Sequence, residues 1–92
     1  MSALYNIFGN IIFYDDPEGT ERGPRRRAAS THLFVVSGKI KIEFGDGETF
    51  MTIGPREEGV IQAGRLHRIV VTKDARYLQK IGKYDTEFDR SE

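Results

Sequence analysis

The stretch from Thr31 to Val71, THLFVVSGKIKIEFGDGETFMTIGPREEGVIQAGRLHRIVV, decides the fold class. It opens with an apolar run that stops at Ser37-Gly38, and a strict alternation of polar and apolar residues follows from Lys39 to Phe44. A period of two indicates a strand with one buried face. The turn signal Gly45-Asp46-Gly47 is typical of a tight connection between strands.

Further short strands are expected on both sides of this alternation. They cover residues 49–53, 60–61, 67–71 and 76–81, and residues 4–14 form two strands around a turn or one strand with a bulge. Lys73-Asp74 is expected to be a turn, and Asp15 to Gly19 a solvated loop. Short strands separated by turn residues predict an all-β antiparallel sandwich or barrel.

Composition narrows the class of protein. The 92 residues correspond to a single domain, with a core at about residues 22–82 and a polar tail at 83–92. The 14 basic and 14 acidic residues cancel, which argues against a nucleic-acid binder. The lack of cysteine excludes disulfides and thiolate chemistry. With no long apolar run and no signal-peptide pattern, we expect no membrane association and a cytoplasmic location.

One charge run stands out. Arg22 is followed by Gly-Pro and then by three adjacent arginines, Arg25 to Arg27. In an extended segment Arg25 and Arg27 share one face. Guanidinium groups suit carboxylates and phosphates, so the run is either an anion site or a solvated surface segment.

Three segments resemble the cupin superfamily, whose members are small β-barrels of the double-stranded β-helix, or jelly-roll, type. They are the run from Phe34 to Ile42, the Gly45-Asp46-Gly47 turn and the segment from Gly59 to His67. In the last segment the family's second motif is matched by Gly59, Gly64 and His67, and Gln62 stands where the family usually has proline. The resemblance implies a cupin-like jelly-roll barrel. Arg22-Gly23 and the tail from Tyr84 to Arg90 are distantly similar to cupins that isomerise nucleotide-linked keto-sugars.

The first cupin motif is lost in this resemblance. Metal-binding cupins carry His-x-His and then Glu before a glycine that matches Gly38. Counted back from Gly38, the Glu position falls on Thr31 and the histidine positions near Arg25 and Arg27. A protonated arginine cannot ligate a metal and a threonine hydroxyl is a poor ligand. We therefore expect no metal site and no cofactor.

His67 is the strongest single candidate, because the cupin register points it into the barrel. It is either a catalytic proton-transfer residue or a packed core histidine. Arg25, Arg27 and Arg65 are expected to converge at the barrel mouth and bind an anion, with Tyr77 or Tyr14 offering a ring face or a hydroxyl. In the same register His32 faces away from the pocket, whereas a shift of one residue would turn it inward and pair it with His67.

The predicted function is that of a degenerate cupin that binds a small anionic ligand in its barrel. The ligand is a sugar phosphate, a nucleotide or a nucleotide sugar, and we expect binding rather than catalysis. Two alternatives stay open: a sugar-nucleotide isomerase or epimerase that uses His67, and a non-catalytic oligomeric interaction module with a filled barrel. A homodimer is expected, since the apolar residues between Leu4 and Ile11 need a cover.

Overall fold

The computed structural model describes residues 10–82, which form six β-strands and no helix. The strands are β1 (Asn10–Asp16), β2 (Glu21–Arg25), β3 (Thr31–Phe44), β4 (Phe50–Ile53), β5 (Glu58–Ile61) and β6 (His67–Ile81). All of their pairings are antiparallel. This confirms the all-β fold class. The residues that the structure describes contain no helix long and apolar enough to cross a membrane.

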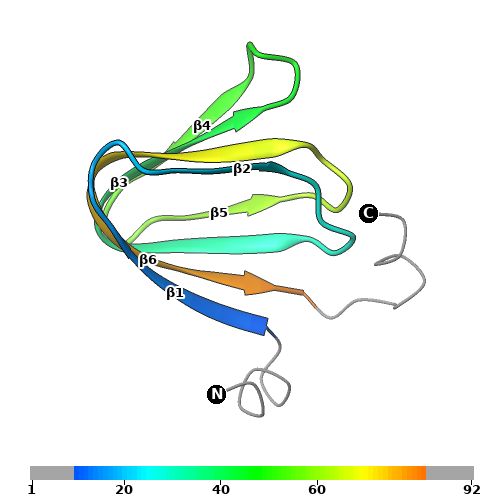
Figure 1. The fold of residues 1–92 in the computed structure, drawn as a ribbon. Helices are drawn as coiled ribbons and strands as arrows, with labels where there is room; N and C mark the ends of the chain where they lie inside the picture. Colours follow the sequence, from blue (N-terminus) through cyan, green and yellow to red (C-terminus); the bar gives the residue numbers. More distant parts are fainter. Residues whose placement is uncertain (1–9, 83–92) are drawn as a thin grey trace.

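The two longest strands, β3 and β6, organise the fold. They have 14 and 15 residues and pair with each other from end to end. Both bend in the middle, so each contributes to two facing layers. The β5 layer has the order β1, second half of β6, first half of β3, β5; the β4 layer has the order β2, first half of β6, second half of β3, β4. Figure 1 shows the layers joined at the bend and open at the other end, as in a jelly-roll sandwich.

The bends replace two predicted chain breaks. Neither Ser37-Gly38 nor Lys73-Asp74 ends a strand, and both expectations were wrong. The β3–β6 register shifts around Ser37 and Lys39 without ending, because bulges absorb the change of direction. Gly38 has a φ of 84°, and a Cβ built on it would lie 2.0 Å from the backbone oxygen of Asp74. Only glycine allows β3 and β6 to approach this closely.

Strand boundaries otherwise shift by a few residues from those expected. Strand β4 begins at Phe50 rather than Thr49, and β5 begins at Glu58 rather than Val60. Strand β1 extends to Asp16, so the predicted loop starts later than expected. Residues 4–9 of the predicted first strand, and the predicted polar tail, lie outside the described residues.

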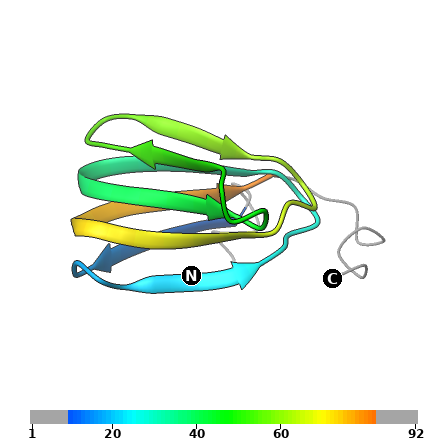
Figure 2. The same cartoon turned by 90° about the horizontal axis from the view of Figure 1, so that it is seen from above.

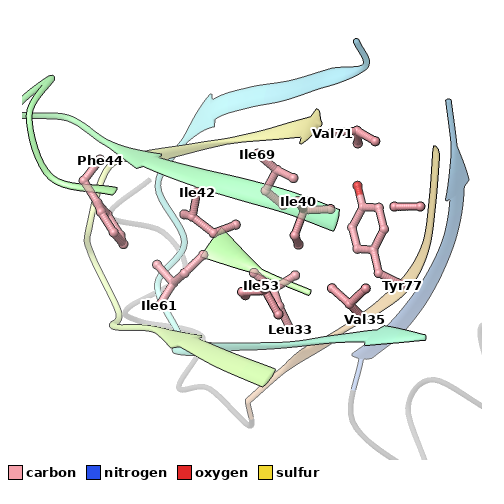
Figure 3. Packing of buried hydrophobic residues seen from close by; sticks show 11 residues of the cluster. Leu33, Val35, Ile40, Ile42, Phe44, Ile53, Ile61, Ile69, Val71 and Tyr77 are labelled. Atoms are coloured by element: carbon pink, nitrogen blue, oxygen red, sulfur yellow. The ribbon is translucent and has the colours of Figure 1, made fainter. Parts of the chain in front are cut away.

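The hydrophobic core fills the space between the two layers (Figure 3). The alternation predicted for β3 is confirmed, because Ile40 and Ile42 are fully buried. The cluster consists of Leu33, Val35, Ile40, Ile42, Phe44, Ile53, Ile61, Ile69, Val71, Ala75 and Tyr77. These side chains come from β3, β4, β5 and β6, so both layers contribute to one core.

Two loops meet at the open end of the layers. Figures 1 and 2 place the β2–β3 loop and the β5–β6 loop at this end. They are tied together, since the backbone N–H of Gly64 donates to the carbonyl of Arg27 at 2.7 Å. The arginine run therefore lies beside the start of β6, where His67 is located.

Candidate functional site

His67 lies at the open end and points into the space between the layers. It is the first residue of β6 and pairs with Phe44 of β3 and Arg25 of β2. Only 2% of its surface is exposed, and Ile69 and Val71 are buried on the same face, as the alternation predicts. Its position is therefore set by two neighbouring strands.

The hydrogen bonding of His67 defines its tautomer. Its Nδ1 lies 3.0 Å from the carbonyl oxygen of Arg65. A carbonyl only accepts, so Nδ1 carries the proton and Nε2 keeps a free lone pair. This Nε2 is buried and has no hydrogen-bond partner within residues 10–82. Burial lowers the pKa of His67, and the charges of Arg27 and Arg25 lower the pKa further. The ring is thus neutral near pH 7.

The structure brings two of the three candidate arginines to His67. Arg25 is exposed at the end of β2, and Arg27 is half-buried in the loop that follows. Both are close enough for their charges to act on the imidazole. Arg65 instead stacks on Phe44, with its guanidinium carbon 3.8 Å from the ring centroid. The cationic group at the mouth therefore consists mainly of Arg25 and Arg27.

Tyr77 lies apart from these arginines, near the bend. It pairs with Val35 in β3 and is 1% exposed. Its hydroxyl donates to Asp16 Oδ2 at 2.8 Å, and its ring stacks on Tyr14 with centroids 4.9 Å apart. Burial, followed by the hydrogen bond to Asp16, raises the pKa of Tyr77. The hydroxyl predicted to contact a ligand is thus engaged inside the fold.

A partly buried ion pair beside Tyr77 was missed by the sequence analysis. Asp16, expected in a solvated loop, is 7% exposed and accepts from Arg22 Nε at 2.8 Å and Nη2 at 2.9 Å. Hydrogen bonding from Arg22 lowers the pKa of Asp16. The Arg22 guanidinium also lies 4.3 Å from the Tyr14 ring centroid. Continuing the β1 alternation through Tyr14 to Asp16 would have indicated an inward carboxylate.

Two more buried polar atoms lack a hydrogen-bond partner among the described residues, as His67 Nε2 does. Thr31 Oγ1 and Gln79 Oε1 belong to residues that are 1% exposed, and within the described range neither atom has a hydrogen-bond partner. The amide nitrogen of Gln79 donates to the Tyr14 hydroxyl at 3.0 Å, which leaves its oxygen as the free end. Such groups are costly to leave unsatisfied and form hydrogen bonds wherever a partner reaches them.

A cleft of about 400 Å³ lies beside His67, at the end of the β4 layer. Its lining consists of Pro24, Lys41, Glu43, Phe44, Gly45, Gly47, Glu48, Thr49, Phe50, Leu66, His67 and Arg68. The cations in it are paired, because Glu43 contacts Arg68 at 2.7 Å and Lys41 at 3.4 Å. Neither Arg25 nor Arg27 lines it. The cleft therefore carries mixed charge, and the cationic group lies next to it.

Comparison with known proteins identifies the fold. No family model matches the sequence, and no curated protein matches it. Solved structures do match, and the fold they define is that of the cupins. A cupin superfamily protein from Desulfitobacterium hafniense has a TM-score of 0.71 at 16% identity over 79% of this chain. An RmlC-like cupin from Shewanella frigidimarina has a TM-score of 0.70 at 14% identity over 86% of this chain.

A further match is a conserved protein of unknown function from Streptococcus pyogenes. It has a TM-score of 0.75 at 17% identity over 82% of this chain. The present chain spans 64% of that protein, 66% of the Desulfitobacterium protein and 69% of the Shewanella protein. At identities this low, the TM-scores establish the shared cupin fold alone. This is the fold that the sequence resemblance predicts.

Many cupins hold a metal ion, which requires several donor side chains that converge on one point. In the part of the chain that the structure describes, no group of three or more His, Asp or Glu side chains is placed to hold a metal. The buried acceptor atoms of His67, Thr31 and Gln79 that lack a hydrogen-bond partner within the described residues are one imidazole nitrogen, one hydroxyl and one amide oxygen. Transition metals prefer several imidazole, thiolate or carboxylate ligands. Within residues 10–82 the available donors therefore do not fit a metal ion.

Proposed function

We propose that this protein is a cupin-fold domain that binds a small anionic molecule at the open end of its two layers. The ligand class is a sugar phosphate, a nucleotide or a nucleotide sugar. The observation that carries the proposal is the position of Arg25 and Arg27 beside His67. Arg25 pairs with His67 between β2 and β6, and the Arg27 carbonyl accepts a hydrogen bond from Gly64 in the loop that leads to His67. Both charges lower the His67 pKa. Positive potential is thereby concentrated next to a neutral, inward-facing ring.

The chemistry of these groups matches a phosphorylated or carboxylated ligand. Guanidinium groups form bidentate hydrogen bonds with phosphate and carboxylate. His67 Nε2 has a lone pair that accepts a hydrogen bond from a ligand hydroxyl. The filled core, in which Leu33 and Ile40 are fully buried, argues for a ligand at the mouth rather than deep in the barrel.

The identity of the replaced residues supports binding without a metal. In the cupin register Arg25, Arg27 and Thr31 take the positions of the first metal motif, so cations stand where neutral imidazoles would be. Such a change favours an anion over a metal ion at the same place. The distant similarity to keto-sugar isomerising cupins makes nucleotide sugars the first ligands to test.

A thermal-shift screen tests this proposal. The panel holds inorganic phosphate, sugar phosphates, nucleotides, nucleotide sugars, carboxylates and divalent metals. A ligand at about 100 times its Kd adds about 2.7 kcal/mol of apparent stability. We expect a shift with at least one phosphorylated compound, and we expect Arg25→Ala and Arg27→Ala each to weaken binding at least about tenfold.

The matched control is Arg76→Ala, which removes the same charge from an exposed side chain near the bend. It should leave the ligand shift unchanged. Equal losses in all three variants would mean that only overall charge matters and would contradict the proposal. A shift with nickel or zinc but with no anion would do the same. Anion binding should also raise the His67 pKa measured by NMR, because it neutralises the field of Arg25 and Arg27.

A second candidate, a sugar-nucleotide isomerase or epimerase, is favoured by the state of His67. Its depressed pKa and free Nε2 lone pair are those of a general base. Such a base takes the proton from the carbon next to a carbonyl, and the C–H electrons move to the carbonyl oxygen as an enolate before reprotonation. Incubation of a bound nucleotide keto-sugar in D₂O should then exchange that proton. His67→Gln should abolish exchange and retain binding; no exchange in the wild type leaves the binding function alone.

The third possibility is an interaction module without a small ligand. The filled interior favours it, since eleven side chains occupy the space between the layers. If no compound in the screen raised the thermal stability, the function would be assigned to the outer surface of the molecule instead.

A further inference from the structure

The cleft at the end of the β4 layer, here called the β4 cleft, opens on the outer face of that layer. Lys41 and Glu43, which line it, alternate with buried isoleucines of β3, so their side chains point outward. The β4 cleft adjoins the proposed anion site at His67, but neither Arg25 nor Arg27 lines it. Its volume of about 400 Å³ lies in the range of about 300–1,000 Å³ that is typical of small-molecule sites. The β4 cleft is thus large enough for a ligand of its own.

An exposed aromatic ring forms one wall of the β4 cleft. Phe50 is 58% exposed and pairs with Glu43, which in turn pairs with Arg68 of β6. Opposed residues stand on the same face of a sheet, so these three side chains form one row across β4, β3 and β6. The ammonium nitrogen of Lys41 lies 4.7 Å from the centroid of the Phe50 ring. The row therefore presents a ring, a carboxylate and a guanidinium group in that order.

The charged groups of this row keep spare hydrogen-bonding capacity. Arg68 donates to Glu43 Oε1 through Nε at 3.2 Å and Nη2 at 2.7 Å, whereas its Nη1 is 3.5 Å from Glu21. Glu43 Oε2 has a 3.4 Å contact with Lys41. Contacts as long as these two are weak, and partly exposed ion pairs contribute little to stability. A ligand can replace both contacts at small cost.

The turn that forms the rim of the β4 cleft is ordered before any ligand binds. Asp46 accepts hydrogen bonds from the Thr49 hydroxyl and from the backbone N–H groups of Thr49 at 2.7 Å and Glu48 at 2.9 Å. The bond from the hydroxyl, followed by the two backbone bonds, lowers the pKa of Asp46 to about 2, so these contacts persist at neutral pH. Order of this kind reduces the entropy lost on binding.

We infer that the β4 cleft binds a free amino acid with an aromatic or large apolar side chain. The ligand ring packs on Phe50, its ammonium group binds Glu43, and its carboxylate binds Arg68 with help from Lys41. The ammonium and carboxylate groups of an amino acid share one carbon, and Glu43 Oε1 and Arg68 Nη2 are likewise adjacent, 2.7 Å apart.

The balance of charge excludes other small ligands. The β4 cleft is lined by two cations, Lys41 and Arg68, and by two carboxylates, Glu43 and Glu48. The carboxylates oppose the negative charge of a phosphorylated ligand. A ligand with a single charge would desolvate the groups of its own sign without pairing them. A zwitterion pairs with both.

An NMR titration of the full chain tests this inference. The probes are L-phenylalanine, phenethylamine, 3-phenylpropionate and glycine; the last three lack the carboxylate, the ammonium group and the ring, respectively. We expect L-phenylalanine to shift the backbone amides of Glu43, Phe50 and Arg68 with a Kd below about 1 mM. Each partial ligand should bind at least about tenfold more weakly, because one of its contacts is missing.

Variants assign each contact to its residue. Phe50→Ala should weaken L-phenylalanine binding about fivefold or more. Arg68→Gln should remove the advantage of L-phenylalanine over phenethylamine, and Glu43→Gln its advantage over 3-phenylpropionate. The matched control is Phe13→Ala, which removes an exposed ring of β1 and should leave the affinity unchanged. Arg27→Ala should also leave it unchanged, which separates this result from the fate of the anion site.

Four results would overturn the inference. The first is the absence of amide shifts at about 10 mM L-phenylalanine, well above the expected Kd. The second is a set of shifts confined to the residues around Arg25 and Arg27. The third is a glycine or phenethylamine affinity equal to that of L-phenylalanine. The fourth is an equal loss of affinity in Phe13→Ala and Phe50→Ala.

Discussion

At the scale of single residues, the adjacent acids Asp15 and Asp16 lie in opposite environments, one exposed and one buried. Asp15 and Asp16 are adjacent in sequence, yet strand alternation sends Asp15 to the outer face and Asp16 to the interior. Asp15 reaches Arg76 across an exposed 3.4 Å contact, whereas Asp16 accepts two short hydrogen bonds from Arg22 and one from Tyr77. The inner pair joins β1, β2 and β6 at their packed side.

The first prediction concerns the pH dependence that Asp16 confers. Its pKa is lowered in the folded state, so its stabilisation is present above the unfolded value of about 3.9 and is lost as pH falls through the folded value. Asp16→Asn should lower the free energy of unfolding by about 2 kcal/mol at pH 7, a reduced figure because the Arg22 side chain is 36% exposed. The difference should shrink as the pH falls below the unfolded value and through the lowered folded value.

Urea unfolding at several pH values measures this difference. Asp15→Asn is the control and should change stability by no more than about 0.5 kcal/mol at any pH, since its pair is exposed. If Asp16→Asn cost the same at low and neutral pH, the carboxylate's charge would not be the stabilising feature.

At the scale of elements, the bend in β3 and β6 sets the architecture. Gly38 combines a positive φ with a close approach to Asp74 and Ala75 of β6. Two short strands would leave their ends unpaired, whereas bent continuous strands keep one ladder and bring two layers together over one core. In the sequence Gly38 resembles the end of a strand, but in the structure it is the point at which β3 bends from one layer to the other.

The second prediction tests this role with two glycines. Gly38→Ala adds backbone strain and forces a methyl group against the Asp74 carbonyl, so it should cost at least about 3 kcal/mol or prevent folding. Gly47 has a similar φ of 76° but open space around its Cβ position, so Gly47→Ala should cost only about 1 kcal/mol. Denaturant unfolding gives both values; equal losses would show that close packing at the bend is unimportant.

At the scale of the whole molecule, no layer is independent of the other. Strands β3 and β6 run through both layers, and the buried cluster takes side chains from each. Opening one layer therefore exposes the core of the second. A fold built in this way should unfold as one cooperative unit.

The third prediction follows from that connectivity. In native-state hydrogen exchange, the slowest amides of the β5 layer, such as Leu33, and of the β4 layer, such as Ile42, should exchange with the same free energy and the same denaturant dependence. Both values should equal the global free energy of unfolding. A β4 layer that opens at markedly lower free energy would contradict this coupling.

Local pattern was enough to predict the all-β fold class and the inward face of β3, where Ile40 and Ile42 alternate with polar residues. The cupin resemblance added the inward position of His67, which is buried on the same face as Ile69 and Val71. These features depend on alternation within a few residues, which any strand obeys whatever it pairs with. The sequence itself therefore determined which side chains turn to the core.

Only the tertiary structure decided which residues meet. The turn between β1 and β2 brings Arg22 to Asp16. The bond from the Tyr77 hydroxyl to Asp16 and the stacking of Arg65 on Phe44 both join segments that are far apart in the chain. Local signals at Gly38 fit a strand end and a bend equally well. The pairing of β3 with β6 chose the bend, because a continuous ladder satisfies backbone hydrogen bonds that two broken strands would leave open.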